Sequence, residues 1–400
     1  MNPVKASQRP SAQKSSAQKP GAQRPGPGGL GAIIIGYLSG LGRFIRSLLQ
    51  QLFTLIGSLV QRGYLWVESW LLDSKKSLYG LGVTRIVFGV TGLTLLMANF
   101  STRLYSFGPG SAWNGEMPVA KSDLARIGIF SMFHDAMLNG AVYTLLYLIL
   151  MLLAVLFILG WRFRIVLPLY FIMWVSFIEA NDMLGDQGDN MYRIALLLFF
   201  FADPAARLSL DARRRAKFAD LPASTPWLVR VWRGHSPLDP QIGSLFHNLA
   251  LVALTAQVCF VYASGALYKA GGVPWSTGYA IYNPLMTERF GTWPELSQIT
   301  THWGAVVAAI SWGSIIMQIT FPLLLLTRPT RILALFGIMS FHIGIAVLMG
   351  LPWFSLTMIA IDFIFVRDRT WKAFGGVISS TFTKSFNPSA VAAEGAEGTS

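Results

Sequence analysis

The chain has 400 residues, of which 53% are hydrophobic and 13% are charged, and its mean hydropathy is +0.50. Soluble domains carry about 25% charged residues, so the composition excludes an ordinary soluble protein and indicates an integral membrane protein. The 32 Lys and Arg residues against 19 Asp and Glu residues give a formal charge of +13. We interpret this excess as basic loops on one side of a membrane rather than as a nucleic-acid surface.

The cysteine and histidines of the sequence do not indicate a disulfide or a metal site. The single cysteine, Cys259, lies inside an apolar run, so the chain cannot form an intrachain disulfide or a thiolate metal cluster by itself. The five histidines show no HExxH or similar spacing. We therefore predict no metal site.

Residues 1–29 hold five basic residues, no acidic residue and several prolines. Such a segment cannot bury enough apolar surface to fold, so we predict a disordered basic tail over 1–29. Its charge suits anionic lipid headgroups; a solvated tail without a partner is an equally good interpretation.

Residues 30–78 are predicted to form an amphipathic helical region at the membrane interface. Apolar residues between Leu41 and Val60 recur at helical spacing, while Arg43, Arg46 and paired glutamines fall on the other face. Whether this helix lies flat or crosses the bilayer stays open.

Eight apolar segments follow, and most approach the roughly 20 residues that a membrane span requires. We therefore predict an all-α polytopic membrane bundle of about eight transmembrane helices over residues 79–372, followed by a disordered C-terminal tail over 373–400. The fourth and eighth segments are short for a span. The predicted segments are 81–100, 141–160, 165–180, 191–202, 246–267, 303–327, 332–351 and 353–366.

The charges of the loops predict the orientation. With eight spans, every strongly basic loop falls on one side, and the loops that contain Asp182, Asp186, Asp189, Glu288 and Glu295 fall on the other. Because basic loops stay in the cytoplasm, we expect both termini to be cytoplasmic in a multi-pass protein.

Lys269 is the first candidate for chemistry. It ends an apolar run in the stretch VYASGALYKAGGVPWSTGYAIY, at the outward-facing edge of the membrane. An ammonium group there costs solvation energy unless it is paired, so a lysine at this place can serve as a base. Gly271 and Gly272 would let the backbone approach closely, and Trp275 would form an aromatic wall. A lysine that only snorkels to the interface is the alternative.

Other polar groups in or near the apolar segments are also candidates. His342 lies in the middle of the seventh segment, where only a neutral imidazole is inexpensive, so it is either a polar orienter in a pocket or a satisfied core histidine. Arg193 follows Asp186 and Asp189 and would pair with one of them at an outer electrostatic rim. Arg85 is expected to make a structural pair with a carboxylate or a headgroup.

Four stretches of the sequence resemble the HTTM family, the membrane domain that vitamin K-dependent gamma-carboxylases share with many bacterial proteins, including those of the sporulation-delaying protein B type. They are TRIVFGVTGLTLLMANFSTRLYSFGPGSAW, GDQGDNMYRIALLLFFFADPAARLSLD, YASGALYKAGGVPWSTGYAIY and FHIGIAVLMGLPWFSLTMIAID. The resemblance implies a bacterial plasma membrane and a role for Lys269 as the base that deprotonates vitamin K hydroquinone.

Two features depart from the carboxylase pattern. Asp189 and Asn190 stand where carboxylases carry a histidine, and the neutral Gln318 stands where related sequences often have an acid. The chain also ends about 35 residues after the last segment, so the large lumenal region that grips protein substrates is missing and processive protein carboxylation is not expected.

Two functions remain. The first is a quinol-linked enzyme, or a maturation factor for a small peptide or protein, with Lys269 as base, His342 as orienter, and an outward-facing pocket for a quinone or hydroquinone. The second is a non-catalytic membrane scaffold or immunity-type binding protein. Membrane lipids are expected partners and nucleic acid is not. The sequence shows no internal repeat or matched broken helices, which argues against a transporter.

Overall fold

The computed structural model describes residues 29–108, 110, 124, 127–180, 184–222 and 224–386, and all regular structure in these ranges is helical. The all-α class predicted from the sequence is therefore confirmed. The chain divides into two compact units, Met1–Val67 and Glu68–Ser400. Most of the predicted basic tail and the last 14 residues lie outside the described residues.

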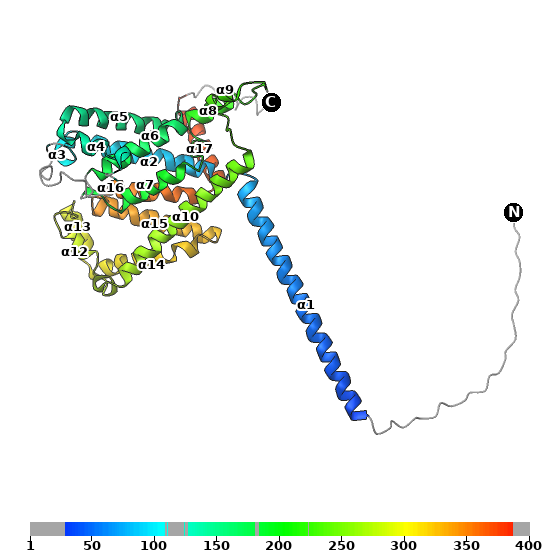
Figure 1. The fold of residues 1–400 in the computed structure, drawn as a ribbon. Helices are drawn as coiled ribbons and strands as arrows, with labels where there is room; N and C mark the ends of the chain where they lie inside the picture. Colours follow the sequence, from blue (N-terminus) through cyan, green and yellow to red (C-terminus); the bar gives the residue numbers. More distant parts are fainter. Residues whose placement is uncertain are drawn as a thin grey trace, which may run out of the picture. The chain divides into compact units, whose positions relative to one another are not determined.

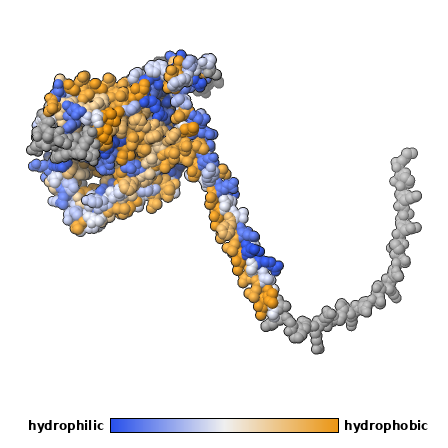
Figure 2. All heavy atoms as spheres, viewed as in Figure 1, coloured by the Kyte–Doolittle hydropathy of each residue, from blue (hydrophilic) through white to orange (hydrophobic). Residues whose placement is uncertain are grey.

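Helix α1, Gly29–Leu72, is a 44-residue helix that covers most of the predicted amphipathic region 30–78 and ends six residues before its predicted end. Its apolar side chains are exposed, including Leu41, Ile45, Leu48 and Leu52, and Figure 2 shows polar and apolar residues on different sides of it. It is not among the helices that are long and apolar enough to cross a membrane. An exposed apolar stripe of this kind needs a lipid or protein surface to cover it.

Five helices are long and apolar enough to cross a membrane, among the described residues. Each coincides with one of the predicted segments. They are α2 (Leu78–Ala98), α5 (Gly140–Leu159), α10 (Pro240–Ala270), α14 (Gly304–Leu324) and α15 (Arg328–Leu348).

The other three predicted segments are helices that are too short to meet the same criterion, so the count of eight spans is not confirmed. They are α6 (Phe163–Glu179), α7 (Gln187–Phe199), and α16 (Pro352–Asp362) with its 3₁₀ extension η5 (Phe363–Phe365). Local signals set their ends: Asp186 and Asp189 form a capping box that starts α7, and Pro352 occupies the first turn of α16.

The C-terminal region differs from the predicted disordered tail. Helix α17, Asp368–Phe386, continues well past residue 373. Phe374, Val377, Ile378 and Phe382 recur at helical spacing and are exposed on it. The prediction was wrong for these residues because it stopped at the last long apolar run and overlooked a shorter amphipathic period.

Short helices fill the connections between the long ones. They are α3 (Arg103–Ser106), η2 (Gly128–Phe130), α4 (Met132–Asp135), η3 (Ala136–Leu138), α8 (Leu210–Lys217), α9 (Trp227–Trp232), α11 (Val273–Ser276), α12 (Tyr282–Leu285) and α13 (Pro294–Thr301).

Within the second unit, α2 packs against α5 and α16, while α10, α14 and α15 pack in sequence along the other side (Figure 1). Helix α16 contacts α2, α7 and α15 and so connects the two halves. Aromatic side chains fill the first half, where the Tyr170 and Tyr192 hydroxyls are 2.8 Å apart. A Cβ on Gly92 would collide with these hydroxyl groups, so α2 needs a glycine at this close approach.

Arg85 of α2 is fully buried and holds three parts of the first half together. Its guanidinium donates to the carbonyls of Phe157 (2.7 Å) and Ile158 at the end of α5, and to those of Pro204 (3.1 Å) and Leu208 (2.6 Å) in the loop after α7. The structural role matches the expectation, but the partners are backbone carbonyls rather than a carboxylate. The carbonyls at a helix C-terminus carry partial negative charge and lack intrahelical donors, which makes them suitable partners for a cation.

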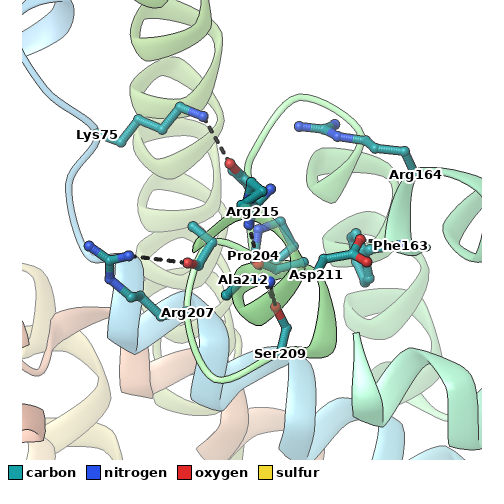
Figure 3. Close-up of polar contacts among 12 residues, drawn as sticks. Lys75, Phe163, Arg164, Pro204, Arg207, Ser209, Asp211, Ala212 and Arg215 are labelled. Atoms are coloured by element: carbon teal, nitrogen blue, oxygen red, sulfur yellow. Dashed lines mark hydrogen bonds and ion pairs between the residues drawn. The ribbon is translucent and has the colours of Figure 1, made fainter. Parts of the chain in front are cut away.

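Polar contacts join the basic connections at the same end of the bundle (Figure 3). Asp203 forms ion pairs with Lys75 (2.9 Å) and Arg215 (3.5 Å). Burial raises the pKa of this carboxyl, but the charges of Arg215 and Lys75 outweigh the burial, and the net pKa lies below its usual range. The Asp211 carboxylate accepts hydrogen bonds from the backbone N–H groups of Arg162 and Phe163 at the start of α6.

We expect Arg85→Lys to lower the free energy of unfolding by roughly 2–4 kcal/mol, because an ammonium group cannot serve all four carbonyls and leaves buried acceptors without donors. Thermal unfolding of the full chain in detergent measures this. Arg207→Lys is the control, since Arg207 makes one long hydrogen bond, 3.5 Å, to the neighbouring carbonyl of Ala206, and its guanidinium lies 5.9 Å from the centroid of the Tyr79 ring, a contact that a lysine can also make. Equal stability of the two variants would contradict the structural role of Arg85.

Candidate functional site

The largest mainly apolar cavity that includes a predicted site residue lies between α10, α14 and α15, and the α11–α12 connection closes one end of it. Its volume is about 590 Å³, within the range of small-molecule sites. Lys269 supplies the only ionisable side chain among its lining residues. The rest of the wall is aromatic, aliphatic or small, with the hydroxyls of Ser314 and Ser340 as further polar groups.

Lys269 is held at the wall of this cavity by neutral groups. Its Nζ donates a hydrogen bond to Gln318 Oε1 at 2.8 Å. The same nitrogen lies 5.0 Å from the ring centroid of Trp275 and 5.1 Å from that of Phe341. No carboxylate forms an ion pair with Lys269 among the described residues. An amine here lacks a counterion, and only an amide oxygen and two aromatic faces stabilise its charge.

The chain direction explains how Lys269 and Trp275 meet. Lys269 lies in the last turn of α10, which ends at Gly271, and Pro274 helps to start the short helix α11 that carries Trp275. Gly271 and Gly272 have φ angles of −77° and −91°, which any residue adopts. Neither glycine lines the cavity. A Cβ on Gly272 would lie 3.3 Å from Cδ1 of Trp275, so the backbone does approach that ring closely, whereas a Cβ on Gly271 would make only ordinary contacts.

His342 belongs to a buried polar network adjacent to the cavity. Its Nε2 lies 3.1 Å from the Tyr262 hydroxyl, and that hydroxyl donates to Asp362 Oδ2 at 2.8 Å. If the Tyr262 proton goes to Asp362, the hydroxyl oxygen accepts from His342 Nε2–H. His342 Nδ1 and Asp362 Oδ1 have no hydrogen-bond partner among the described residues.

His342 lies behind the wall of the cavity, so it does not have the direct role in the pocket that we predicted. Its side chain is 1% exposed and is not part of the cavity wall, whereas its neighbours Phe341 and Phe354 are. The His342 ring centroid lies 5.2 Å from that of Phe341 and 5.6 Å from that of Phe354. His342 therefore contacts the aromatic wall from behind.

Sequence reasoning missed Tyr262 and Asp362. A signal existed for both residues. Asp362 is an acid inside an apolar segment, which marks a functional or structural site. Tyr262 lies seven residues before Lys269, two turns along one face of the same helix.

The predicted rim residues Asp186, Asp189 and Arg193 do come together, but in a separate cavity of about 250 Å³. Arg193 forms an ion pair with Glu179, not with either aspartate as predicted, and also donates to Asn190 Oδ1 at 3.0 Å. The two aspartates instead cap α7: Asp186 Oδ1 accepts from Gly188 N–H at 2.6 Å, and Asp189 Oδ2 accepts from Asp186 N–H at 2.9 Å.

Asp189 is the rim residue with the most perturbed carboxyl. Burial raises its pKa to about 6; the hydrogen bond from the Asp186 backbone and the charge of Arg193 lower it, while the charges of Asp186 and Glu179 raise it further. The carboxyl therefore titrates close to neutral pH.

Leu351 and Phe354 separate the two groups of predicted residues. Both side chains line the Lys269 cavity, and both also line a third cavity, of about 260 Å³, which contains Asp186 and Asp189. The structure thus places Lys269 and Trp275 in one compartment and the aspartates in another. No group of three or more His, Cys, Asp or Glu side chains within the described ranges has a geometry suited to a metal ion.

The helices and the cavity together define an all-helical membrane protein with a lysine in an apolar ligand-sized pocket. Residues 241–371 match the family model of the HTTM domain, so this region of the chain is similar to that domain. The match contains every helix that forms the Lys269 cavity. No curated protein and no solved structure matches the chain closely enough to add further evidence.

Asp189→Asn tests the perturbed carboxyl. The pKa of about 6 lies above the unfolded value of 3.8, so the folded protein binds more protons between these pH values, and the carboxyl's contribution to stability is lost as the pH rises from about 4 to 6. The asparagine variant should gain up to about 3 kcal/mol relative to the native protein over this window, as measured by chemical unfolding at several pH values. Parallel pH profiles for the two proteins would contradict the assignment.

Proposed function

We propose that this protein binds a planar apolar hydroxylated molecule of the quinol class in the Lys269 cavity and that Lys269 removes a proton from its hydroxyl group. The observation that carries the proposal is the amine itself: it lines a 590 Å³ apolar cavity, is held by a neutral amide, and has no carboxylate partner among the described residues. The resemblance to the carboxylase membrane domain supports the same ligand class.

The cavity fits such a molecule in size and chemistry. A ring system would contact the aromatic and aliphatic wall, and Trp275 and Phe341 would flank its polar edge next to the amine. When bound, a hydroquinone supplies an acidic hydroxyl and, after ionisation, an electron-rich ring that reacts with oxygen.

The contribution of the protein is a proton acceptor in a site without bulk water. A neutral amine can donate one N–H to Gln318 Oε1 and still present its nitrogen lone pair to the cavity. The proton moves from the hydroxyl oxygen to Nζ, and the resulting ammonium and phenolate form an ion pair in the apolar surroundings. Ion pairing thus replaces the counterion that the free site lacks.

His342, Tyr262 and Asp362 would position the aromatic wall rather than touch the ligand. Their hydrogen bonds connect α10, α15 and α16 behind Phe341 and Phe354. We further propose that the basic loops lie in the cytoplasm of a bacterial cell, with the cavity near the outer face of the plasma membrane. No observation on the described residues supports a peptide or protein substrate.

A non-catalytic binding protein is the second candidate, because the same neutral surroundings of Lys269 would also suit an ammonium group that only holds an anionic or hydroxylated ligand. The two functions share the cavity and differ in the need for a proton acceptor. The two experiments below therefore test binding and proton removal separately.

Ligand binding is tested by quenching of tryptophan fluorescence with menadione in the reconstituted full chain. Gly344 lines the cavity and a Cβ there meets open space, so Gly344→Leu should fill the site and weaken quenching at least tenfold. Gly265→Leu is the matched control, since Gly265 also faces open space but lies outside the cavity wall. Trp275→Phe should remove the saturable component. Unchanged quenching in Gly344→Leu would refute the site.

Proton removal is tested by oxygen uptake with menadiol, because the ionised hydroquinone reacts with oxygen faster than the neutral one. The native protein should accelerate uptake over empty nanodiscs, and Lys269→Met should lower the acceleration at least 100-fold. Lys269→Arg keeps the charge but stays protonated, so it should also fail. Gln318→Glu supplies a counterion that keeps the lysine protonated, and should slow uptake too. Full activity of Lys269→Arg would leave binding as the function.

A further inference from the structure

A second large cavity, about 660 Å³, lies near the other end of α10 and has a basic mouth. Val252 of α10 and Leu325 of the α14–α15 turn belong to its apolar wall, together with Phe365. Lys76, Arg331 and Arg367 also line it. Val252 lies 17 residues before Lys269 on α10, which separates the two sites by about 25 Å along the helix axis.

The positive charge of this mouth is not neutralised within the protein. Arg328 and Arg369 act electrostatically on Arg367 together with Arg331. Within the described ranges none of these four arginines forms an ion pair. The acid that lines the cavity, Asp368, is already engaged, because its carboxylate accepts from the backbone N–H groups of Leu78 (3.1 Å) and Tyr79 (2.9 Å) at the start of α2.

Two of the three basic side chains are partly held in place. Arg331 Nε and Nη2 donate to the Leu325 carbonyl at 3.1 and 2.9 Å, which leaves Nη1 available. Lys76 Nζ donates to Ser74 Oγ at 2.9 Å and has two further N–H groups. Arg367 makes no side-chain hydrogen bond to another described residue and is exposed. Unused donors on three cations at one cavity mouth suit an anionic phosphate group.

The surroundings favour a lipid over a free phosphate. The apolar wall comes from α10, the α14–α15 turn and η5, and Arg331 of α15 also lines the cavity. Helices α10 and α15 are long and apolar enough to cross a membrane, and Val252 is 47% exposed on the bundle surface. Helix α17 starts at Asp368, at the cavity, and presents the exposed apolar residues Phe374, Val377 and Ile378. An amphipathic helix beside a basic cluster is typical of a membrane surface.

We propose that this cavity is a binding site for one anionic glycerophospholipid, with its phosphate at Lys76, Arg331 and Arg367 and an acyl chain on the wall that includes Val252, Leu325 and Phe365. The site is distinct from the Lys269 cavity and does not depend on the function proposed there. Its occupant would stabilise the junction of α2, α10, α15 and α17, because all four helices or their caps contribute to it.

Native mass spectrometry of the full chain in detergent tests the proposal, with dioleoyl phosphatidylglycerol and dioleoyl phosphatidylcholine as probes. The native protein should retain one phosphatidylglycerol at least tenfold more tightly than phosphatidylcholine. The double variant Lys76→Gln with Arg367→Gln should weaken phosphatidylglycerol binding roughly 30-fold and leave phosphatidylcholine unaffected. Arg331 is left in place because it also bonds the backbone.

The control variant removes two exposed arginines of the basic loop, Arg213→Gln with Arg230→Gln, and so changes the net charge equally. It should bind phosphatidylglycerol as the native protein does. Equal weakening in both double variants would show a diffuse charge effect and overturn the site. Glycerol phosphate is the third probe: if it displaces the lipid at similar concentration, the apolar wall contributes nothing and the lipid assignment fails.

Val252→Trp fills the apolar wall without changing charge and provides a second line of evidence. It should weaken phosphatidylglycerol binding while glycerol phosphate binding stays the same. Thermal unfolding without added lipid checks that each variant remains folded. Phosphatidylglycerol binding that is unchanged in a folded Val252→Trp protein would contradict the acyl-chain position.

Discussion

The first half of the bundle depends on a buried guanidinium without a counterion. A charge at Arg85 would be prohibitively costly in a membrane protein core if it were left alone. Four backbone carbonyls solvate it, two from the end of α5 and two from the loop after α7. The Phe157 carbonyl also accepts from Gly160 N–H at 3.1 Å, but the last carbonyls of a helix lack their full set of intrahelical donors, so the cation and the helix end stabilise each other. The arrangement fixes where α2, α5 and the basic loop meet, and this fixes the frame on which α16 packs.

In the second half of the bundle, the ionisable side chains at and behind the Lys269 cavity contact other side chains rather than backbone carbonyls. Tyr262, His342 and Asp362 hydrogen-bond to one another across three helices but leave His342 Nδ1 and Asp362 Oδ1 without partners among the described residues. Lys269 contacts Gln318 and two aromatic rings. Neither arrangement gives the lysine a fixed anion. A site of this kind gains most from a ligand that brings or develops negative charge next to the amine, which is why proton removal and binding are the two functions to separate.

The sequence predicted much of this arrangement because it rests on strong local signals. Long apolar runs located the five candidate spans, and the isolated lysine followed by Trp275 indicated the cavity wall. Apolar content failed as a signal where the structure depends on features other than a long apolar run. We predicted the short helices α6, α7 and α16 as membrane spans because apolar content alone does not determine the length of a helix. The apolar period of α17 was overlooked next to longer runs.

The partners of buried charges were the least predictable feature. A search for opposite charges nearby in sequence suggested Asp186 or Asp189 for Arg193, but tertiary packing brought Glu179. Backbone carbonyls, which satisfy Arg85, leave no mark in the sequence at all. Likewise, His342 was recognisable as a buried imidazole, but its place behind Phe341 and Phe354 depends on how three helices cross.

The shared wall of Leu351 and Phe354 has an electrostatic consequence. The charges that act on Asp189 are those of Asp186, Glu179 and Arg193, and Lys269 is not among them. The partition therefore keeps the two chambers electrostatically separate in the ligand-free protein. Because hydrocarbon screens charge far less than water does, only a new charge brought into one chamber by a ligand would act on the other.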